Sequence, residues 1–132
     1  MAIGLVFLRK ILLGMKGASE KMVSFILLLI VFGTNMFYYT VEEPSMSHIY
    51  SFAFITLFFW LSKLFFEKQK FWKLILLSAI YAIIILIRPV NALIILLLPF
   101  IAGDKIAFFT GIKTIFNKHV WLISTLMVFL MI

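Results

Sequence analysis

Long apolar runs alternate with short polar gaps along the chain, and this pattern predicts helices that cross a lipid bilayer. A helix rises about 1.5 Å per residue, so roughly 20 apolar residues cross a hydrocarbon core about 30 Å thick. We therefore predict an all-α, polytopic transmembrane helical bundle with about four full spans and partial terminal spans. The predicted spans are residues 22–39, 48–66, 71–87, 90–102 and 120–132.

Three further segments qualify this picture. Residues 1–16 contain Arg9 and Lys10 and are too short to span, so we expect an interfacial helix or the tail of a helix that begins earlier. Residues 104–118 mix lysines with phenylalanines, a pattern typical of a helix in the membrane interface. Pro89 disfavours helix at Arg88, so two short helices should meet at residues 88–91.

Composition supports lipid as the solvent. Of the 132 residues, 65% are hydrophobic and 13% are charged, whereas a soluble domain is about half apolar and about a quarter charged. The net charge of +7 does not indicate nucleic acid, because the basic residues lie in the gaps between apolar runs and form no single basic face. The chain has no cysteine, which excludes disulfides and thiolate metal sites.

The distribution of positive charge predicts an orientation. With the spans above, every lysine and arginine except Arg88 falls on one side of the membrane. By the positive-inside rule that side is cytoplasmic. We expect a multi-pass protein of the cytoplasmic (inner) membrane, with Arg88 and the loop from Glu42 to His48 on the extracytoplasmic side.

Arg88 is the sharpest single signal for chemistry. Its guanidinium offers five donors in a planar fork that suits phosphate or carboxylate. Phosphate binding is one hypothesis, an ion pair with Glu42 or Glu43 is a second, and an arginine reaching the headgroups is a third. The other candidates for binding a substrate or its phosphate lie near the same membrane boundary; they are Asn91, Asn35, Tyr38, Tyr39, Ser47 and Tyr50.

The catalytic residues are not fixed by the sequence, and the candidates are Glu42, Glu43 and His48. The glutamates could supply a general base or hold a divalent cation, or they could form an ordinary solvated loop. His48 could move a proton, bind phosphate as imidazolium, or simply bond to Glu43 at a helix start. The tyrosines could form an aromatic belt and Ser47 a helix cap. Phosphate loops and zinc-protease motifs are absent from the sequence, and no residue is assigned to a metal site.

Two stretches resemble a known family. Gly33-Thr34-Asn35-Met36-Phe37-Tyr38-Tyr39, followed by the stretch from Glu43 to Phe52, resembles bacterial GT-C glycosyltransferases, the group that includes protein mannosyltransferases and the lipid A aminoarabinose transferase. Arg88-Pro89 between apolar helices, closing at Pro99, is similar to an element of the same family. The resemblance implies transfer of a sugar from a polyprenyl-phosphate donor to an extracytoplasmic acceptor, with Arg88 as a phosphate contact.

The family's catalytic acid usually lies in a large first outer loop, which this chain lacks. We therefore expect a fragment that is inactive alone, whose partners are the bilayer, the lipid-linked donor and the remainder of its own longer chain, with no nucleic acid. Two alternatives stay open. Broken helices with polar residues also describe a multi-pass transporter or flippase, and the polar residues could be helix contacts in a small structural membrane protein.

Overall fold

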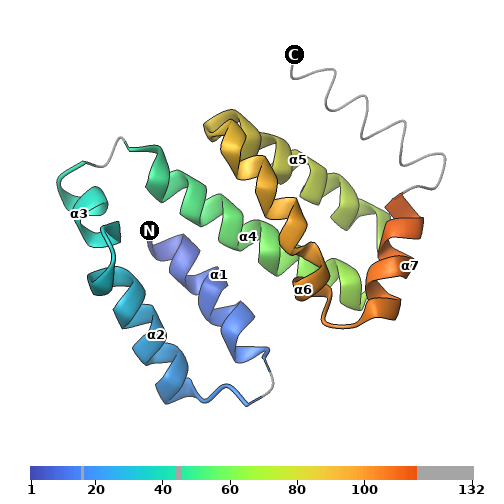
Figure 1. Ribbon diagram of the computed structural model, residues 1–132, viewed down its shortest axis with the longest axis horizontal. Coiled ribbons are helices and arrows are strands. Elements are labelled where there is room, and N and C mark those ends of the chain that lie inside the picture. The colour runs from blue at the N-terminus through green and yellow to red at the C-terminus, as the bar shows by residue number, and fades with distance from the viewer. Residues whose placement is uncertain (16, 44–45, 116–132) are drawn as a thin grey trace. The chain divides into compact units, whose positions relative to one another are not determined.

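Every regular element is a helix in the part of the chain that the structure, a computed structural model, describes, namely residues 1–15, 17–43 and 46–115. The all-α prediction is therefore confirmed for these residues. In chain order the elements are α1 (Ala2–Leu13), α2 (Glu20–Gly33), α3 (Met36–Val41), α4 (Ser47–Glu67), α5 (Phe71–Ile87), the 3-10 helix η1 (Pro89–Leu97), α6 (Leu98–Ala102) and α7 (Lys105–Ile115) (Figure 1). The predicted span 120–132 lies outside the described residues.

Two of the predicted spans coincide with single helices. α4 matches the prediction for 48–66 to within one residue at each end, and α5 matches 71–87. Among the described residues, α4 is the one helix both long and apolar enough to cross a membrane. α5 and the segment Pro89–Ala102 are apolar but shorter. A bundle of about four spans thus stays a prediction.

The run 22–39 is not one helix, contrary to the expectation of a continuous span. α2 ends at Gly33, Thr34 adopts an extended conformation (φ −124°, ψ 170°), and α3 begins at Met36. The Thr34 hydroxyl donates to the Ile30 carbonyl at 2.5 Å and accepts from the Met36 amide at 3.3 Å. One side chain therefore satisfies groups on both sides of the break, a local competition that hydropathy alone does not reveal.

The predicted break at Arg88 is confirmed, but the segment after it is wound more tightly than an α-helix. Arg88 is extended (φ −154°, ψ 115°) and η1 follows for nine residues before α6 adds five. A 3-10 helix rises about 2.0 Å per residue, so the segment reaches about 25 Å where an α-helix would reach about 21 Å. The 3-10 winding therefore makes the short segment that was predicted as the span 90–102 longer than an α-helix of the same number of residues.

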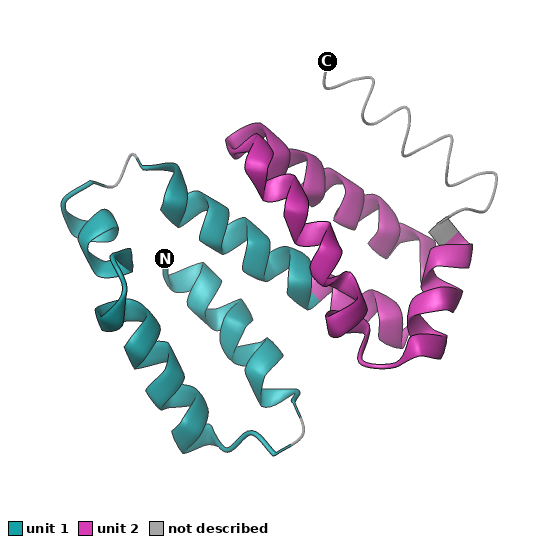
Figure 2. Cartoon of the chain, viewed as in Figure 1, with its two compact units in different colours: residues 1–60 teal, residues 61–132 magenta. Residues whose placement is uncertain are grey.

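The chain forms two compact units, residues 1–60 and 61–132, coloured separately in Figure 2. In unit 1, α1 runs in the same direction as α4, because Gly4 lies against Phe52 and Phe7 stacks near Trp60 at 5.1 Å between ring centroids. α2 runs back along α1, with Arg9 and Glu20 paired at 3.2 Å. Within the predicted interfacial segment 1–16, the helix Ala2–Leu13 is thus packed in this unit.

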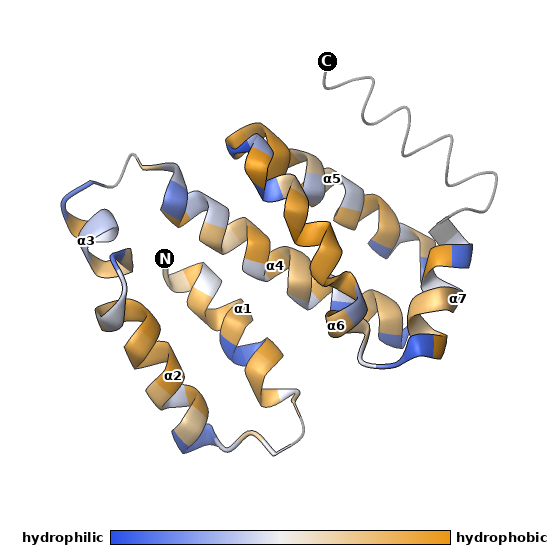
Figure 3. Ribbon diagram, in the orientation of Figure 1, coloured by the Kyte–Doolittle hydropathy of each residue, from blue (hydrophilic) through white to orange (hydrophobic). Residues whose placement is uncertain are grey.

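Unit 2 is built on the end of α4, with α5 and α7 packed against it. Its core is mainly apolar, with the buried hydrophobic side chains Leu61, Phe65, Phe66, Leu74, Leu77, Ile80 and Ile84, and it also buries Ser62 and Lys73. The Lys73 ammonium donates to the Leu64 carbonyl, which caps the last turn of α4. Hydropathy colouring shows apolar residues along the helices and polar residues gathered at turns and ends (Figure 3).

Candidate functional site at the helix breaks

The residues singled out from the sequence fall into two groups, one in each unit. Unit 1 holds most of them: Asn35, Tyr38, Tyr39, Glu42, Glu43, Ser47, His48 and Tyr50. Unit 2 holds Arg88 and Asn91. Each group is described within its own unit, and a site shared by the two stays a prediction from the sequence.

α3 and its caps hold four residues of the first group, Asn35, Tyr38, Tyr39 and Glu42. Asn35 is its N-cap and Glu42 its C-cap. The Tyr39 amide donates to the Asn35 carbonyl at 3.0 Å, and the Glu42 amide donates to the Tyr38 carbonyl at 2.9 Å. The helical steps predicted from Asn35 through the tyrosines to Glu42 are therefore confirmed, although they belong to a separate short helix rather than to the end of α2.

A stacked pair connects α3 to the start of α4. The rings of Tyr39 and His48 lie 5.0 Å apart between centroids and 16° from parallel. Tyr38 meets Tyr39 edge-on at 5.8 Å, and the Thr40 hydroxyl lies 3.3 Å from the sulfur of Met1. Of the unit 1 candidates, Tyr39 and His48 are the two side chains that a described ring contact brings together across different helices.

The remaining candidates of unit 1 face outward to different degrees. Tyr38 and Tyr50 are each 51% exposed, and Glu42 is exposed, whereas Glu43 and Ser47 are half-buried. In the described part of the chain, no three histidine, aspartate or glutamate residues gather as a metal site would require. The proposed roles of Glu42 and Glu43 as base or cation ligand stay untested.

Backbone hydrogen bonds hold the Arg88 residue on both sides. The Arg88 amide donates to the Ile84 carbonyl at 3.2 Å, and the Asn91 amide donates to the Arg88 carbonyl at 2.9 Å. Arg88 and Asn91 are half-buried, while Leu86 and Val90 beside them are 64% and 63% exposed. The Arg88 backbone is thus held at the end of an apolar helix, with exposed apolar side chains on either side of it in the sequence.

Tyr81 is a member of this group that the sequence analysis did not single out. Its hydroxyl donates to the Ala92 carbonyl at 2.9 Å and so ties α5 to η1 across the break. Tyr81 precedes Arg88 by seven residues, two helical turns, and Arg88 follows the last residue of α5. That spacing could have indicated Tyr81 from the sequence. A single tyrosine in an apolar run is, however, a weak indication unless it is known that η1 folds back along α5.

The side chains of Arg88 and Asn91 are chemically suited to an anionic ligand. The guanidinium and the Asn91 amide offer several donors and suit the oxygens of a phosphate monoester or diester.

Comparison with models of known families, with curated proteins and with solved structures finds no match for this chain.

Proposed function

We propose that the chain is a multi-pass membrane protein and supplies the phosphate-binding helices of a GT-C-type glycosyltransferase, which moves a sugar from a polyprenyl-phosphate donor to an extracytoplasmic acceptor. The observation that carries the proposal is the fixed position of Arg88 at the end of the apolar helix α5, between the outward-facing Leu86 and Val90. A lipid phosphate presents its charge at this boundary, directly above its hydrocarbon chain.

Charge separation along each unit supports the expected orientation. In unit 1, Arg9 lies beside Glu20 at the start of α2, so Lys21 is at the same end, while Glu42 follows α3 at the other end. In unit 2, α5 separates Arg88 from the turn containing Lys68 and Lys70. Each unit thus carries a lysine-rich end, as expected for a cytoplasmic boundary.

The role proposed for Arg88 is electrostatic. When a polyprenyl phosphate leaves the sugar, negative charge grows on its phosphate oxygens, and a fixed guanidinium stabilises that charge without reorganising. Hydrogen bonds to charged groups contribute about 1.5–3 kcal/mol each. Removal of the guanidinium should therefore weaken binding of a polyprenyl phosphate by about 10-fold to 150-fold.

The test is binding of a short polyprenyl phosphate to the chain in lipid nanodiscs, with the matching polyprenyl alcohol as headgroup control. Arg88→Gln should bring the affinity for the phosphate down to that for the alcohol. Arg88→Lys should recover part of the loss, because it keeps the charge but not the planar fork. Arg9→Gln is the matched control, since Arg9 is the other arginine of the sequence and is exposed.

Equal binding of phosphate and alcohol by the unaltered chain would contradict the proposal, as would equal losses in Arg88→Gln and Arg9→Gln. Orientation is tested separately with single cysteines, because the chain has none of its own. A cysteine at Glu42 should react with an impermeant reagent from outside the cell. A cysteine at Lys21 should react only after the membrane is opened.

One observation favours a second candidate, a multi-pass transporter or flippase. η1 continues for nine residues, although 3-10 helices beyond about four residues are uncommon and a long one often marks a hinge. Discontinuous helices form substrate sites in secondary carriers. Transport of a lipid phosphate across a sealed bilayer without any sugar transfer would favour this candidate over the transferase.

A further inference from the structure

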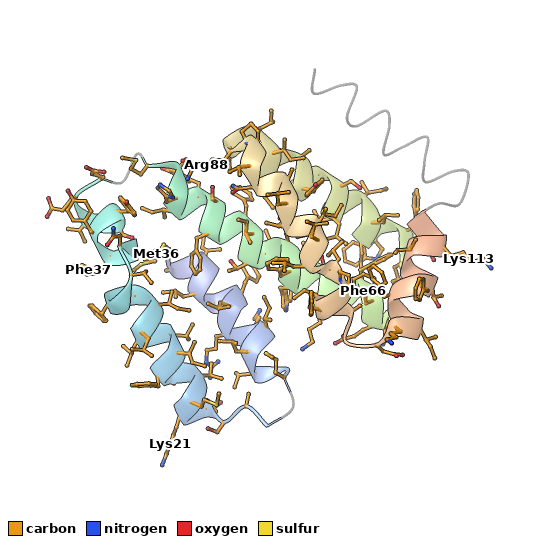
Figure 4. All side chains as sticks on the ribbon, in the orientation of Figure 1. Lys21, Met36, Phe37, Phe66, Arg88 and Lys113 are labelled. Carbon is orange, nitrogen blue, oxygen red and sulfur yellow. The ribbon has the colours of Figure 1, made fainter. Side chains whose placement is uncertain are left out.

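α7 packs one of its faces against the rest of unit 2. Gly111 lies so close to Phe66 that a β-carbon at this glycine would stand 2.7 Å from the ring. The rings of Phe66 and Phe108 lie 6.1 Å apart between centroids. The Thr114 hydroxyl donates to the Gln69 side-chain oxygen at 2.9 Å. These contacts place α7 against the end of α4 and the turn that leads to α5 (Figure 4).

The opposite face of α7 combines exposed apolar side chains with lysines. Ile106 is 75% exposed and Phe109 67% exposed, despite their size. Lys113 follows Phe109 by four residues, so it shares their stripe, and Lys105 precedes Ile106. Figure 4 shows Lys113 pointing away from the helices. An apolar centre with a cation at each end is therefore presented outward.

Two more lysines lie on the turn against which α7 packs. Lys68 and Lys70 are exposed and flank Gln69, whose side chain bonds to the residue after Lys113. We name the group of Lys68, Lys70, Lys105, Ile106, Phe109 and Lys113 the α7 surface. The acidic residues beside it are Glu67 and Asp104, so four positive charges outnumber two negative ones.

We propose that the α7 surface docks on an anionic phospholipid bilayer. Ile106 and Phe109 would enter the boundary between headgroups and acyl chains, and the lysines would lie over the headgroup phosphates. Charge complementarity selects this occupant, because the lysines at both ends of the apolar centre, with Lys68 and Lys70 on the neighbouring turn, match the headgroup phosphates while the apolar side chains match the acyl chains. A nucleic-acid phosphate would satisfy the lysines but leave the two apolar side chains in water. The inference rests on the membrane location proposed above, but not on sugar transfer.

The test uses the full chain in nanodiscs, with an environment-sensitive fluorophore on a cysteine at Thr110. Thr110 is exposed on the same face, and its replacement keeps both apolar side chains. Quenchers attached to the lipid acyl chains then report the fraction of α7 that is docked. Docking should be stronger with phosphatidylcholine plus phosphatidylglycerol than with phosphatidylcholine alone. Docking should weaken at about 1 M salt, because the Debye length is then about 3 Å and the attraction between lysines and lipid phosphates is largely screened.

Each lysine near an anionic surface contributes a factor of about five to binding. Lys113→Gln should therefore lower the ratio of docked to undocked α7 about fivefold in the anionic nanodiscs. Lys21→Gln is the matched control, because it removes an exposed helical lysine from unit 1, and it should leave the ratio unchanged. Phe109→Ser should lower docking in both lipid compositions.

Equal quenching in the two lipid compositions would overturn the proposal. A fluorophore that is already shielded in detergent without lipid would also overturn it, because this would indicate a protein partner. A fluorophore that is shielded by an added oligonucleotide, and not by phosphatidylglycerol, would overturn it as well. Extraction with alkaline carbonate separates the two proposals. If the chain is released from membranes, the membrane function fails; if it stays embedded but the label ignores anionic lipid, only the docking of α7 fails.

Discussion

The close approach of α1 and α4 at Gly4 gives a test of the packing in unit 1. A β-carbon at Gly4 would lie 2.6 and 2.7 Å from Phe52 ring atoms and 3.2 Å from the Ala53 α-carbon. The ring can rotate away, but the backbone of Ala53 cannot, so Gly4→Ala must separate the two helices slightly. Overpacking of this kind costs about 1–3 kcal/mol.

Alanine also favours helix over glycine by about 1 kcal/mol, which obscures the clash in a single measurement. Gly33→Ala removes this ambiguity, because Gly33 is also helical and nothing lies within 4 Å of the β-carbon it would gain. The difference in unfolding free energy between the two variants therefore isolates the clash. We expect Gly4→Ala to be less stable than Gly33→Ala by about 1–3 kcal/mol.

The assay is reversible unfolding of the chain in mixed micelles by increasing detergent denaturant, followed by circular dichroism. A difference below about 0.5 kcal/mol, the usual limit of additivity, would refute the packing of Gly4 against α4. Adding Phe52→Leu to Gly4→Ala should recover part of the loss, because a smaller side chain leaves room for the new methyl group. A loss unchanged by Phe52→Leu would show that the ring is not the obstacle.

Three further predictions concern the helix breaks and α7. Thr34→Val removes the hydroxyl shared across the α2–α3 break, so amide exchange at Met36 should accelerate by about fivefold or more, and unchanged exchange would contradict the cap. Tyr81→Phe removes the bond to η1, worth about 0.5–1.5 kcal/mol, and should speed exchange throughout η1 while leaving α2 unaffected. Gly111→Ala should loosen α7 by forcing a methyl group into Phe66, seen as faster proteolysis within α7; equal rates in both proteins would refute that contact.

The sequence predicted α4 and α5 well because long apolar runs with charged or proline ends leave few alternatives. The prediction from the sequence differed most from the structure in the run 22–39, where the apolar character continues unbroken through Gly33. Hydropathy measures preference for lipid, whereas the break depends on one hydroxyl at Thr34 that competes for backbone groups. The winding of η1 was likewise invisible, since its nearly uniform apolar sequence has no period that distinguishes a 3-10 helix from an α-helix.

The candidate site was predictable as a set of residue types but not as an arrangement. Spacing gave the helical steps of α3 and the break at Arg88. The stack of Tyr39 on His48 joins separate helices, and the bond from Tyr81 to η1 needs the chain to return on itself. Contacts of that kind depend on tertiary packing, which local patterns do not encode.

Side-chain hydroxyls satisfy backbone groups at the helix breaks, as the proposed lipid environment would require. In hydrocarbon an unsatisfied backbone or side-chain polar group costs several kcal/mol, because water cannot replace the missing partner. Here hydroxyls supply partners from within: Thr34 serves the α2–α3 break, Tyr81 the break after α5, and Thr56 inside α4 bonds back to its own helix at 2.8 Å. Among the described residues, no buried side-chain nitrogen or oxygen lacks a hydrogen bond. Side-chain hydroxyls at the helix breaks therefore meet the demand that the proposed membrane location would place on polar groups.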